Sequence, residues 1–140
     1  MISAKKEGSS GVVDMIPLVI IIAVCGIMFL YFAREAKYLD ICNSLNNSMR
    51  KTILKMESTR GLTQADMDNL TAELESYGLL DVTYDGTTLY NSSLRPGDEI
   101  SLYVKCRYSA NALNTDGLLD AALMAVSRDI NVSRHSVVMK

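Results

Sequence analysis

A run of nineteen residues without a charged side chain lies between Asp14 and Arg34. As a helix, residues 15–33 would be about 28 Å long, close to the ~30 Å thickness of the hydrocarbon core of a membrane. A cleaved secretory signal has a shorter apolar core that ends at small residues, whereas this run continues directly into the charged stretch AREAKYLDI at residues 33–41. The sequence therefore predicts a membrane-spanning helix that stays attached to the rest of the chain.

Apolar residues continue beyond this run at intervals of three or four residues. They are Phe32, Ala36, Leu39, Cys42, Leu45, Met49, Ile53 and Met56. This spacing indicates one apolar stripe along a helix, and no proline or glycine interrupts residues 33–60. We therefore expect one helix from about residue 15 to about residue 57, apolar all round in its first half and amphipathic in its second, with Gly61 as its C-cap.

Residues 59–140 predict one further helix. Thr63 is a suitable N-cap with Asp66 three residues later, a variant of the capping box, and Gly78 is a suitable end. Leu70 and Leu74 belong to the expected buried stripe of this helix, together with Met67 and Tyr77.

The same region then changes to a strand period. Asp85-Gly86 predicts a two-residue type I′ hairpin between residues 82–84 and 87–90, and Pro96-Gly97 predicts a further turn. Apolar and polar residues alternate over residues 100–108, which is typical of a half-buried strand. We expect a loop at residues 111–119, a strand from residue 122 in which Arg128 is the one misfit, and a continuation of the sheet at residues 137–138.

These elements predict an α+β fold: a long N-terminal helix packed on a small antiparallel sheet of three to five strands, with one additional helix. Because one face of such a sheet must be covered, we expect the amphipathic half of the long helix to cover it. The expected domains are a leader or cytoplasmic segment at residues 1–14, a transmembrane helix at 15–33, an amphipathic extension at 34–58 and a head at 59–140.

Composition excludes some classes of function. The 14 basic and 16 acidic residues are dispersed and give a net charge of -2, so no polybasic patch for nucleic acid is present. No catalytic or metal-binding motif occurs, and we interpret the single histidine, His135, as a surface or edge-strand residue. The sequence thus predicts no enzyme, no metal and no cofactor. An enzyme of the cell envelope, with a site built from scattered polar groups, is a remote alternative.

Three cysteines occur, and only Cys42 and Cys106 belong to the expected aqueous part of the chain. We interpret them as small buried apolar residues. A disulfide between them is the alternative.

The junction before the apolar run carries a resemblance to a known family. Lys5 and Lys6 precede Gly8 and Gly11, and Asp14 stands at the start of the span. Here the chain resembles bacterial type IV pilins and, more closely, TadE-like pseudopilins, and it is similar to small pilin-like membrane proteins of Gram-positive bacteria with a comparable Gly-Val-Asp junction. In architecture the resemblance covers nearly the whole chain, but its specific motif covers only residues 5–17.

The resemblance implies that a prepilin peptidase cuts after Gly8 or Gly11 and that Asp14 helps subunits to register during assembly. A cut after Gly8 makes Asp14 the sixth residue and a cut after Gly11 makes it the third, whereas the acidic residue of the family is usually the fifth. The alternative reading is that Asp14 only marks the start of the span. Ala23, Gly26 and Ala33 are candidates for close helix contact, since small residues allow helices to approach in a membrane.

The distribution of basic residues and the resemblance predict opposite orientations. The basic residues after the span outnumber those before it, which favours a cytoplasmic head; they are Arg34, Lys37, Arg50 and Lys51. The resemblance implies an extracellular head. We adopt the second orientation, because a head of this size can be translocated despite its charges.

Together these observations predict a single-pass cell-membrane protein: a pilin-like structural subunit or minor pseudopilin of a Tad-like filament, secretion or conjugation apparatus, positioned at the cell membrane or in a surface filament. Its expected partners are the membrane, further copies or pilin-like co-subunits, a prepilin peptidase and an assembly platform. The alternative is a bitopic accessory protein that does not polymerise and binds a partner through its extracellular head.

Overall fold

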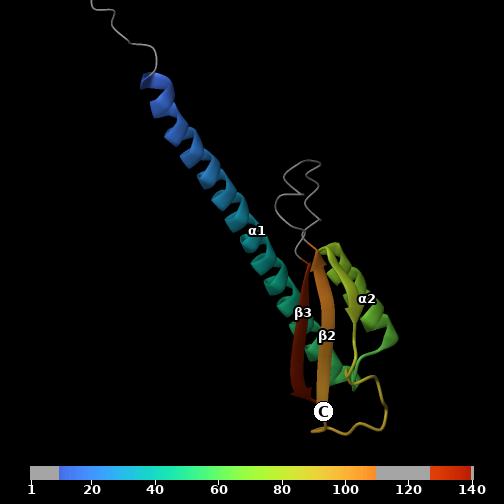
Figure 1. Cartoon of the computed structure of the whole chain (residues 1–140). Helices are drawn as coiled ribbons and strands as arrows, with labels where there is room; N and C mark the ends of the chain where they lie inside the picture. The colour runs from blue at the N-terminus through green and yellow to red at the C-terminus, as the bar shows by residue number, and fades with distance from the viewer. Residues whose placement is uncertain (1–9, 110–126, 140) are drawn as a thin grey trace, which may run out of the picture. The chain divides into compact units, whose positions relative to one another are not determined.

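The computed structural model describes residues 10–109 and 127–139, which fall into two compact units that separate between Lys37 and Tyr38. Figure 1 shows the elements in chain order: α1 (Ser10–Thr59), α2 (Gln64–Ser76), β1 (Leu79–Thr83), β2 (Glu99–Ser109) and β3 (Ser127–Val137). The strands form one antiparallel sheet in the order β1-β2-β3. The expected α+β fold, with a long N-terminal helix, one more helix and a small antiparallel sheet, is confirmed.

Helix α1 is one continuous helix of 50 residues. It begins at Ser10, so residues 10–14, expected in the leader, are helical. At its end the Gly61 N–H donates to the Met56 carbonyl oxygen at 3.1 Å, the long bond of a Schellman motif. The left-handed residue is Arg60, with φ 62°, one position earlier than expected. Gly61 follows with φ 117° and lies so close to residue 89 that a Cβ would stand 2.5 Å from the Leu89 carbonyl oxygen.

Helix α2 has the expected ends. Thr63 is its N-cap, and the Thr63 hydroxyl accepts a hydrogen bond from the Asp66 N–H. The helix stops at Ser76, and Gly78 follows with φ 82°. Leu70 and Leu74 are buried, as the apolar stripe predicts.

Strand β2 is the centre of the sheet and confirms the alternation in the sequence. Its even-numbered residues from Ile100 to Tyr108 are buried, whereas Tyr103, Lys105 and Arg107 are exposed. Strand β3 pairs with β2 along its whole length, from Glu99↔Val137 to Ser109↔Ser127. The pairing of β1 with β2 is shorter and shifts register between Leu80 and Thr83.

The expected type I′ hairpin at Asp85-Gly86 is wrong. The Thr87 N–H donates to the Tyr84 carbonyl oxygen at 3.0 Å, so a turn exists, but Gly86 has a positive φ and Asp85 does not. A type I′ turn needs positive φ at both central residues. Residues 87–90 therefore do not return along β1. The turn at Pro96-Gly97 is present, with a 3.0 Å bond from the Asp98 N–H to the Arg95 carbonyl oxygen.

Residues 87–88 instead continue along the edge of β2 beyond the short strand β1. The Thr88 N–H donates to the Ser101 carbonyl oxygen at 2.8 Å, and the Thr87 hydroxyl bonds both the N–H and the carbonyl oxygen of Tyr103 at 2.9 Å. The Thr87 side chain thus takes the place of strand backbone as the partner of Tyr103. This arrangement explains why the segment after the turn is not a strand of its own.

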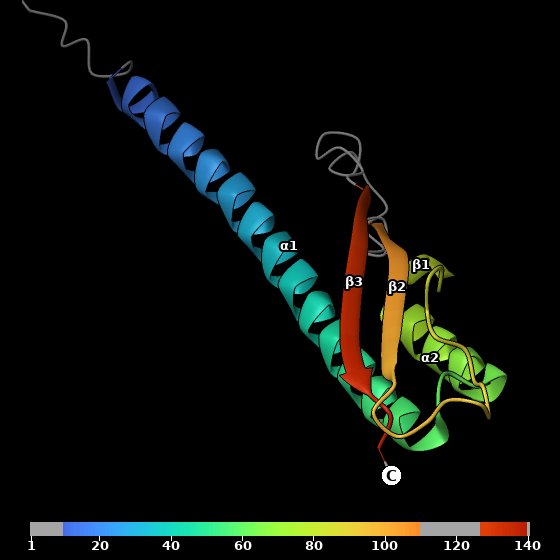
Figure 2. The same ribbon diagram turned by 90° about the horizontal axis from the view of Figure 1, so that it is seen from below.

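The core of the head lies between the sheet and a layer formed by α2 and the second half of α1 (Figure 2). On α1 the buried apolar residues are Ile41, Leu45, Met49, Ile53 and Met56. The expected stripe therefore holds from Leu45 onward. Leu39 is 59% exposed, because at about 100° per residue it lies some 120° round the helix from Leu45.

The strand expected from residue 122 is described only from Ser127, where β3 begins. The loop at 111–119 and the first strand residues at 122–126 lie outside the described residues. Arg128, the misfit of the strand pattern, places its guanidinium 4.7 Å from the centre of the Tyr38 ring of α1. Its charge thereby interacts with the aromatic face of Tyr38, which packs against the core.

Candidate functional site

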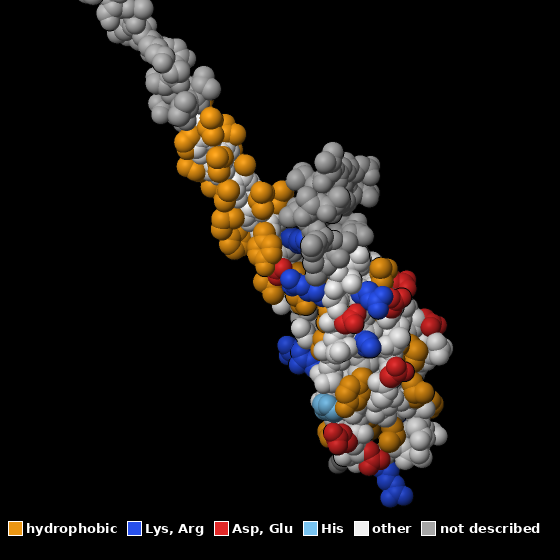
Figure 3. Space-filling view, viewed as in Figure 1, with side chains coloured by type: hydrophobic (Ala, Val, Ile, Leu, Met, Phe, Trp, Pro, Cys, Tyr) orange, Lys and Arg blue, Asp and Glu red, His pale blue; other side chains and the backbone are white. Residues whose placement is uncertain are grey.

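The first half of α1 presents apolar side chains on all sides. From Met15 to Phe32 the large apolar residues are 42% to 72% exposed, and they form the continuous orange surface in Figure 3. Among the described residues α1 is the helix that is long and apolar enough to cross a membrane, by length and composition. An exposed apolar surface of this extent indicates contact with lipid or with other protein.

The residues expected at the processing junction are only partly described. Gly8 lies outside the described residues, as do Lys5 and Lys6. Gly11 belongs to the first turn of α1, where an added Cβ would meet no atom within 4 Å. Asp14 also belongs to α1 by its backbone. Gly11 and Asp14 therefore lie three residues apart in helical backbone, which places them on neighbouring positions of one helix face.

The small residues expected at a helix contact are exposed on α1. Gly26 and Ala33 are seven residues apart and thus lie on nearly the same face, and Ala23 is about 60° away around the helix. An added Cβ at Gly26 would meet no atom within 4 Å. This face leaves room for the close approach of another helix.

Cys42 of α1 and Cys106 of β2 carry free thiols. Cys106 is buried and Cys42 half-buried. Burial raises the pKa of the Cys106 thiol to about 11, and the neighbouring Cys42 adds to the shift. Such a thiol stays protonated at neutral pH and behaves as a small apolar side chain.

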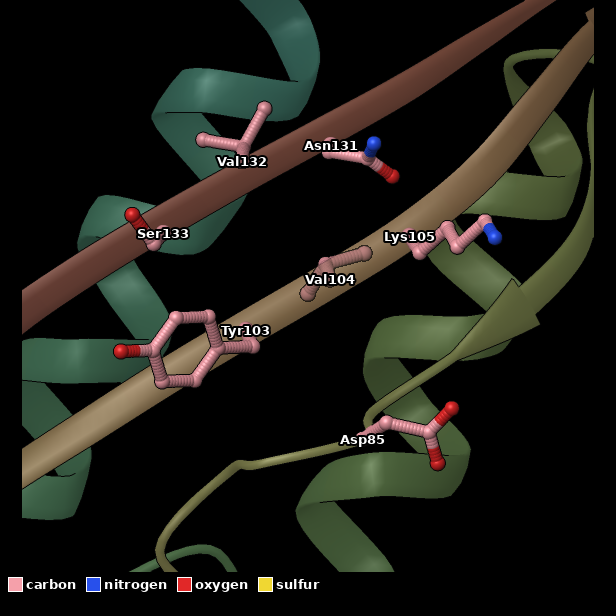
Figure 4. Close-up of a pocket in the computed structure, with 7 residues that line it drawn as sticks. All are labelled: Asp85, Tyr103, Val104, Lys105, Asn131, Val132 and Ser133. Atoms are coloured by element: carbon pink, nitrogen blue, oxygen red, sulfur yellow. The ribbon is translucent and has the colours of Figure 1, made fainter.

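The outward face of the sheet carries a shallow hollow of about 420 Å³ (Figure 4). It is lined by Asp85, Tyr103, Val104, Lys105, Asn131, Val132 and Ser133. The Tyr103 ring lies over Gly86 and meets the His135 ring edge-on, with 5.5 Å between the ring centres. These side chains offer hydrogen-bond donors and acceptors on an open surface.

His135 lies on the edge strand β3 and is exposed. Its Nδ1 atom is 3.1 Å from the Ser101 Oγ atom and 3.6 Å from a Glu99 carboxylate oxygen. Both partners come from the neighbouring strand β2, so the sequence neighbourhood of His135 did not reveal them. Within the described residues no three potential metal ligands gather into one group.

A second hollow, of about 380 Å³, lies between the second half of α1 and β3. Asn46, Arg50 and Glu57 line it from α1, and Arg134 and Ser136 line it from β3. The Arg134 guanidinium donates to the Asn46 side-chain oxygen at 3.1 Å, and the Ser136 hydroxyl donates to the Glu57 carboxylate. The hollow could not be predicted from the alternation of β3, because the hollow depends on where α1 packs.

Two further carboxylates are held by hydrogen bonds between the helices. Lys55 and the Thr63 hydroxyl both donate to Asp66, and these bonds lower the pKa of the Asp66 carboxyl, that from Lys55 most. The Ser48 hydroxyl donates to Glu73 at 2.7 Å and, as the largest cause, lowers the pKa of that carboxyl. These contacts join α1 to α2. The sequence pattern did not reveal them, because they join residues that are 11 and 25 positions apart in the chain.

No family model, characterised protein or solved structure matches this chain. The function is therefore argued from the apolar half of α1, the junction before it and the surfaces of the head.

Proposed function

We propose that this protein is a membrane-anchored, pilin-like structural subunit or minor pseudopilin of a Tad-like filament, secretion or conjugation apparatus, with its head outside the cell. The observation that carries the proposal is that the two halves of α1 differ in their surroundings. Its first half exposes apolar side chains on every side, and its second half is part of the core of an α+β head. One helix thus serves as an anchor and as a structural element of the head.

The proposed mechanism is helix packing and not catalysis. In an assembly the apolar halves of neighbouring α1 helices would pack together, with Gly26 and Ala33 as points of close approach. Asp14 would neutralise the N-terminal amine of a neighbouring subunit after processing. A charge pair in such a low-dielectric bundle is worth more than one in water, and an amine left unpaired there is costly.

Processing is the first test. Co-expression with the cognate prepilin peptidase should shorten the chain after Gly8 or Gly11, as measured by mass spectrometry of the N-terminus. Replacement of both glycines by leucine should abolish the shortening. An unchanged N-terminus in the parent chain would contradict the proposed role.

Assembly is the second test, made by crosslinking in membranes that contain the native partner proteins. Asp14→Ala should leave membrane insertion intact and abolish the crosslinked ladder, and Asp14→Glu should partly restore it. Equal ladders for the parent and Asp14→Ala would show that Asp14 only marks the membrane edge.

A second candidate function is an anchored accessory protein that does not polymerise and binds a partner through its head. The offset of Asp14 from the usual fifth position of the family favours it, because a displaced carboxylate would miss the amine of a neighbour. Membrane attachment without processing and without a ladder is the result that this alternative predicts.

A further inference from the structure

The two edges of the sheet are built differently. The edge at β1 is short, shifts register and contains Asp81 with φ 53°, and residues 87–88 cover β2 beyond it. Short strands and irregularities of this kind prevent the addition of further strands. The edge at β3 has 11 residues, contains no proline and keeps one register with β2 throughout.

The backbone groups that face outward from β3 follow from the pairing of β2. Ser101 and Tyr103 direct their N–H and carbonyl groups to residues 87–88. Because successive residues of a strand alternate their hydrogen-bonding side, the even-numbered residues of β2 bond β3, as in the pair Val104↔Val132. The odd-numbered residues of β3 therefore turn their N–H and carbonyl groups away from β2.

These odd-numbered residues are accessible. Asp129, Asn131, Ser133, His135 and Val137 are all exposed, and within residues 10–109 and 127–139 no backbone hydrogen bond outside the sheet reaches them. An exposed, regular strand edge is the template to which an extended peptide adds as a further strand. Such addition supplies affinity through main-chain hydrogen bonds.

The hollow beside this edge indicates the charge of the occupant. Arg50 and Arg134 line it, and neither forms an ion pair with a carboxylate of the described residues. Glu57, which also lines the hollow, is bound by the Ser136 hydroxyl. Two guanidinium groups beside a free strand edge complement an acidic side chain, to which arginine can donate two parallel hydrogen bonds.

We propose that the β3 edge binds an extended acidic segment of a partner protein, which adds as a fourth strand and directs a carboxylate toward Arg50 and Arg134. A second copy of this chain fits less well, because it would bring its own Arg50 and Arg134 to the same interface. The inference is independent of the pilin-like role, since it depends only on the head.

The test uses the full chain in detergent micelles and a heptapeptide of alternating threonine and glutamate with blocked ends. Amide hydrogen exchange, measured by NMR, should slow at least tenfold at Asn131, Ser133 and His135 when the peptide saturates the protein. Exchange at Val132 and Arg134 should not change, because their amides already bond β2. A peptide with N-methyl groups at alternate residues and one with lysine for glutamate should have no such effect.

Matched variants distinguish the contribution of main-chain hydrogen bonds to binding from the contribution of charge. Ser133→Pro removes one donor from the free edge and none from the β2 pairing, so it should abolish binding, whereas Ser133→Ala should bind as the parent does. Arg50→Gln with Arg134→Gln should weaken binding about tenfold while the fold is kept.

Any of the following results would overturn the proposal. The first is unchanged exchange of the three amides at millimolar peptide. The second is equal binding of the N-methylated peptide or equal binding to the double arginine variant. The third is protection of these amides without peptide that grows with protein concentration, which would identify a second copy as the occupant.

Discussion

At the scale of single residues, Asp66 combines hydrogen bonds to the N-cap residue Thr63, an ion pair with Lys55 and burial. Its side chain is 9% exposed and accepts hydrogen bonds from Lys55 and Thr63. These bonds lower the pKa of Asp66 in the folded state. The stability that they contribute is present above the unfolded-state pKa of about 4 and is lost as the pH falls through the lower folded-state pKa.

Asp66→Asn should therefore lower the free energy of unfolding by about 1 to 2 kcal/mol at pH 7. The loss should shrink as the pH is lowered toward 2, because the parent carboxyl is also protonated once the pH falls below its folded-state pKa. Urea unfolding of the full chain in detergent at both pH values measures this. Asp68→Asn is the control, since Asp68 is exposed and, among the residues that the structure describes, its side chain accepts a hydrogen bond from Gln64 alone. A loss independent of pH would contradict the assignment to charge.

Two features of the structure favour glycine at position 61: the backbone conformation and the lack of space for a Cβ. Gly61 has a positive φ, and an added Cβ would stand 2.5 Å from the Leu89 carbonyl oxygen. Gly97 has a positive φ of 94° with open space around it. Gly61→Ala should therefore cost about 2 to 3 kcal/mol, against about 1 kcal/mol for Gly97→Ala. Equal melting temperatures for the two variants would show that the contact with residue 89 relaxes without cost.

At the scale of elements, the second half of α1 is the test of how the head is completed. Leu45 is fully buried and Leu39 is 59% exposed, although both belong to the stripe expected from the sequence. Leu45→Ala should lower the free energy of unfolding by about 2 to 5 kcal/mol, and Leu39→Ala by less than about 0.5 kcal/mol. Thermal melting and limited proteolysis of the full chain measure both. Similar melting of the two variants would mean that the stripe faces other subunits or solvent.

At the scale of the whole molecule, attachment to a membrane depends on the apolar half of α1. The full chain should fractionate with membranes and resist extraction by alkaline carbonate. The double variant Ile21→Lys with Ile22→Lys should be released, because each lysine should weaken membrane insertion by about 2.5 to 3.5 kcal/mol. The Leu54→Lys variant, changed at an exposed position in the second half of α1, should stay attached. Release of the intact parent by carbonate would contradict a membrane span.

Features that depend on near neighbours in the chain could be predicted from the sequence. The uncharged run at 15–33 predicts a long apolar helix, Thr63 predicts a helix start, and the alternation at 100–108 predicts a half-buried strand. Each of these follows from side-chain spacing or backbone chemistry within a few residues. The roles of Gly8, Gly11 and Asp14 come from a resemblance and stay predictions.

Which segments lie next to one another could not be predicted in the same way, because it depends on how the whole chain folds. The place of β2 decides whether residues 87–90 return along β1 or continue along β2. The rotation of α1 against the sheet decides whether Leu39 or Ile41 enters the core. That no described segment pairs with the outer edge of β3 is likewise a property of strand order. Sequence periodicity assigns faces to helices and strands, but a strand edge becomes free only when no other segment pairs with it.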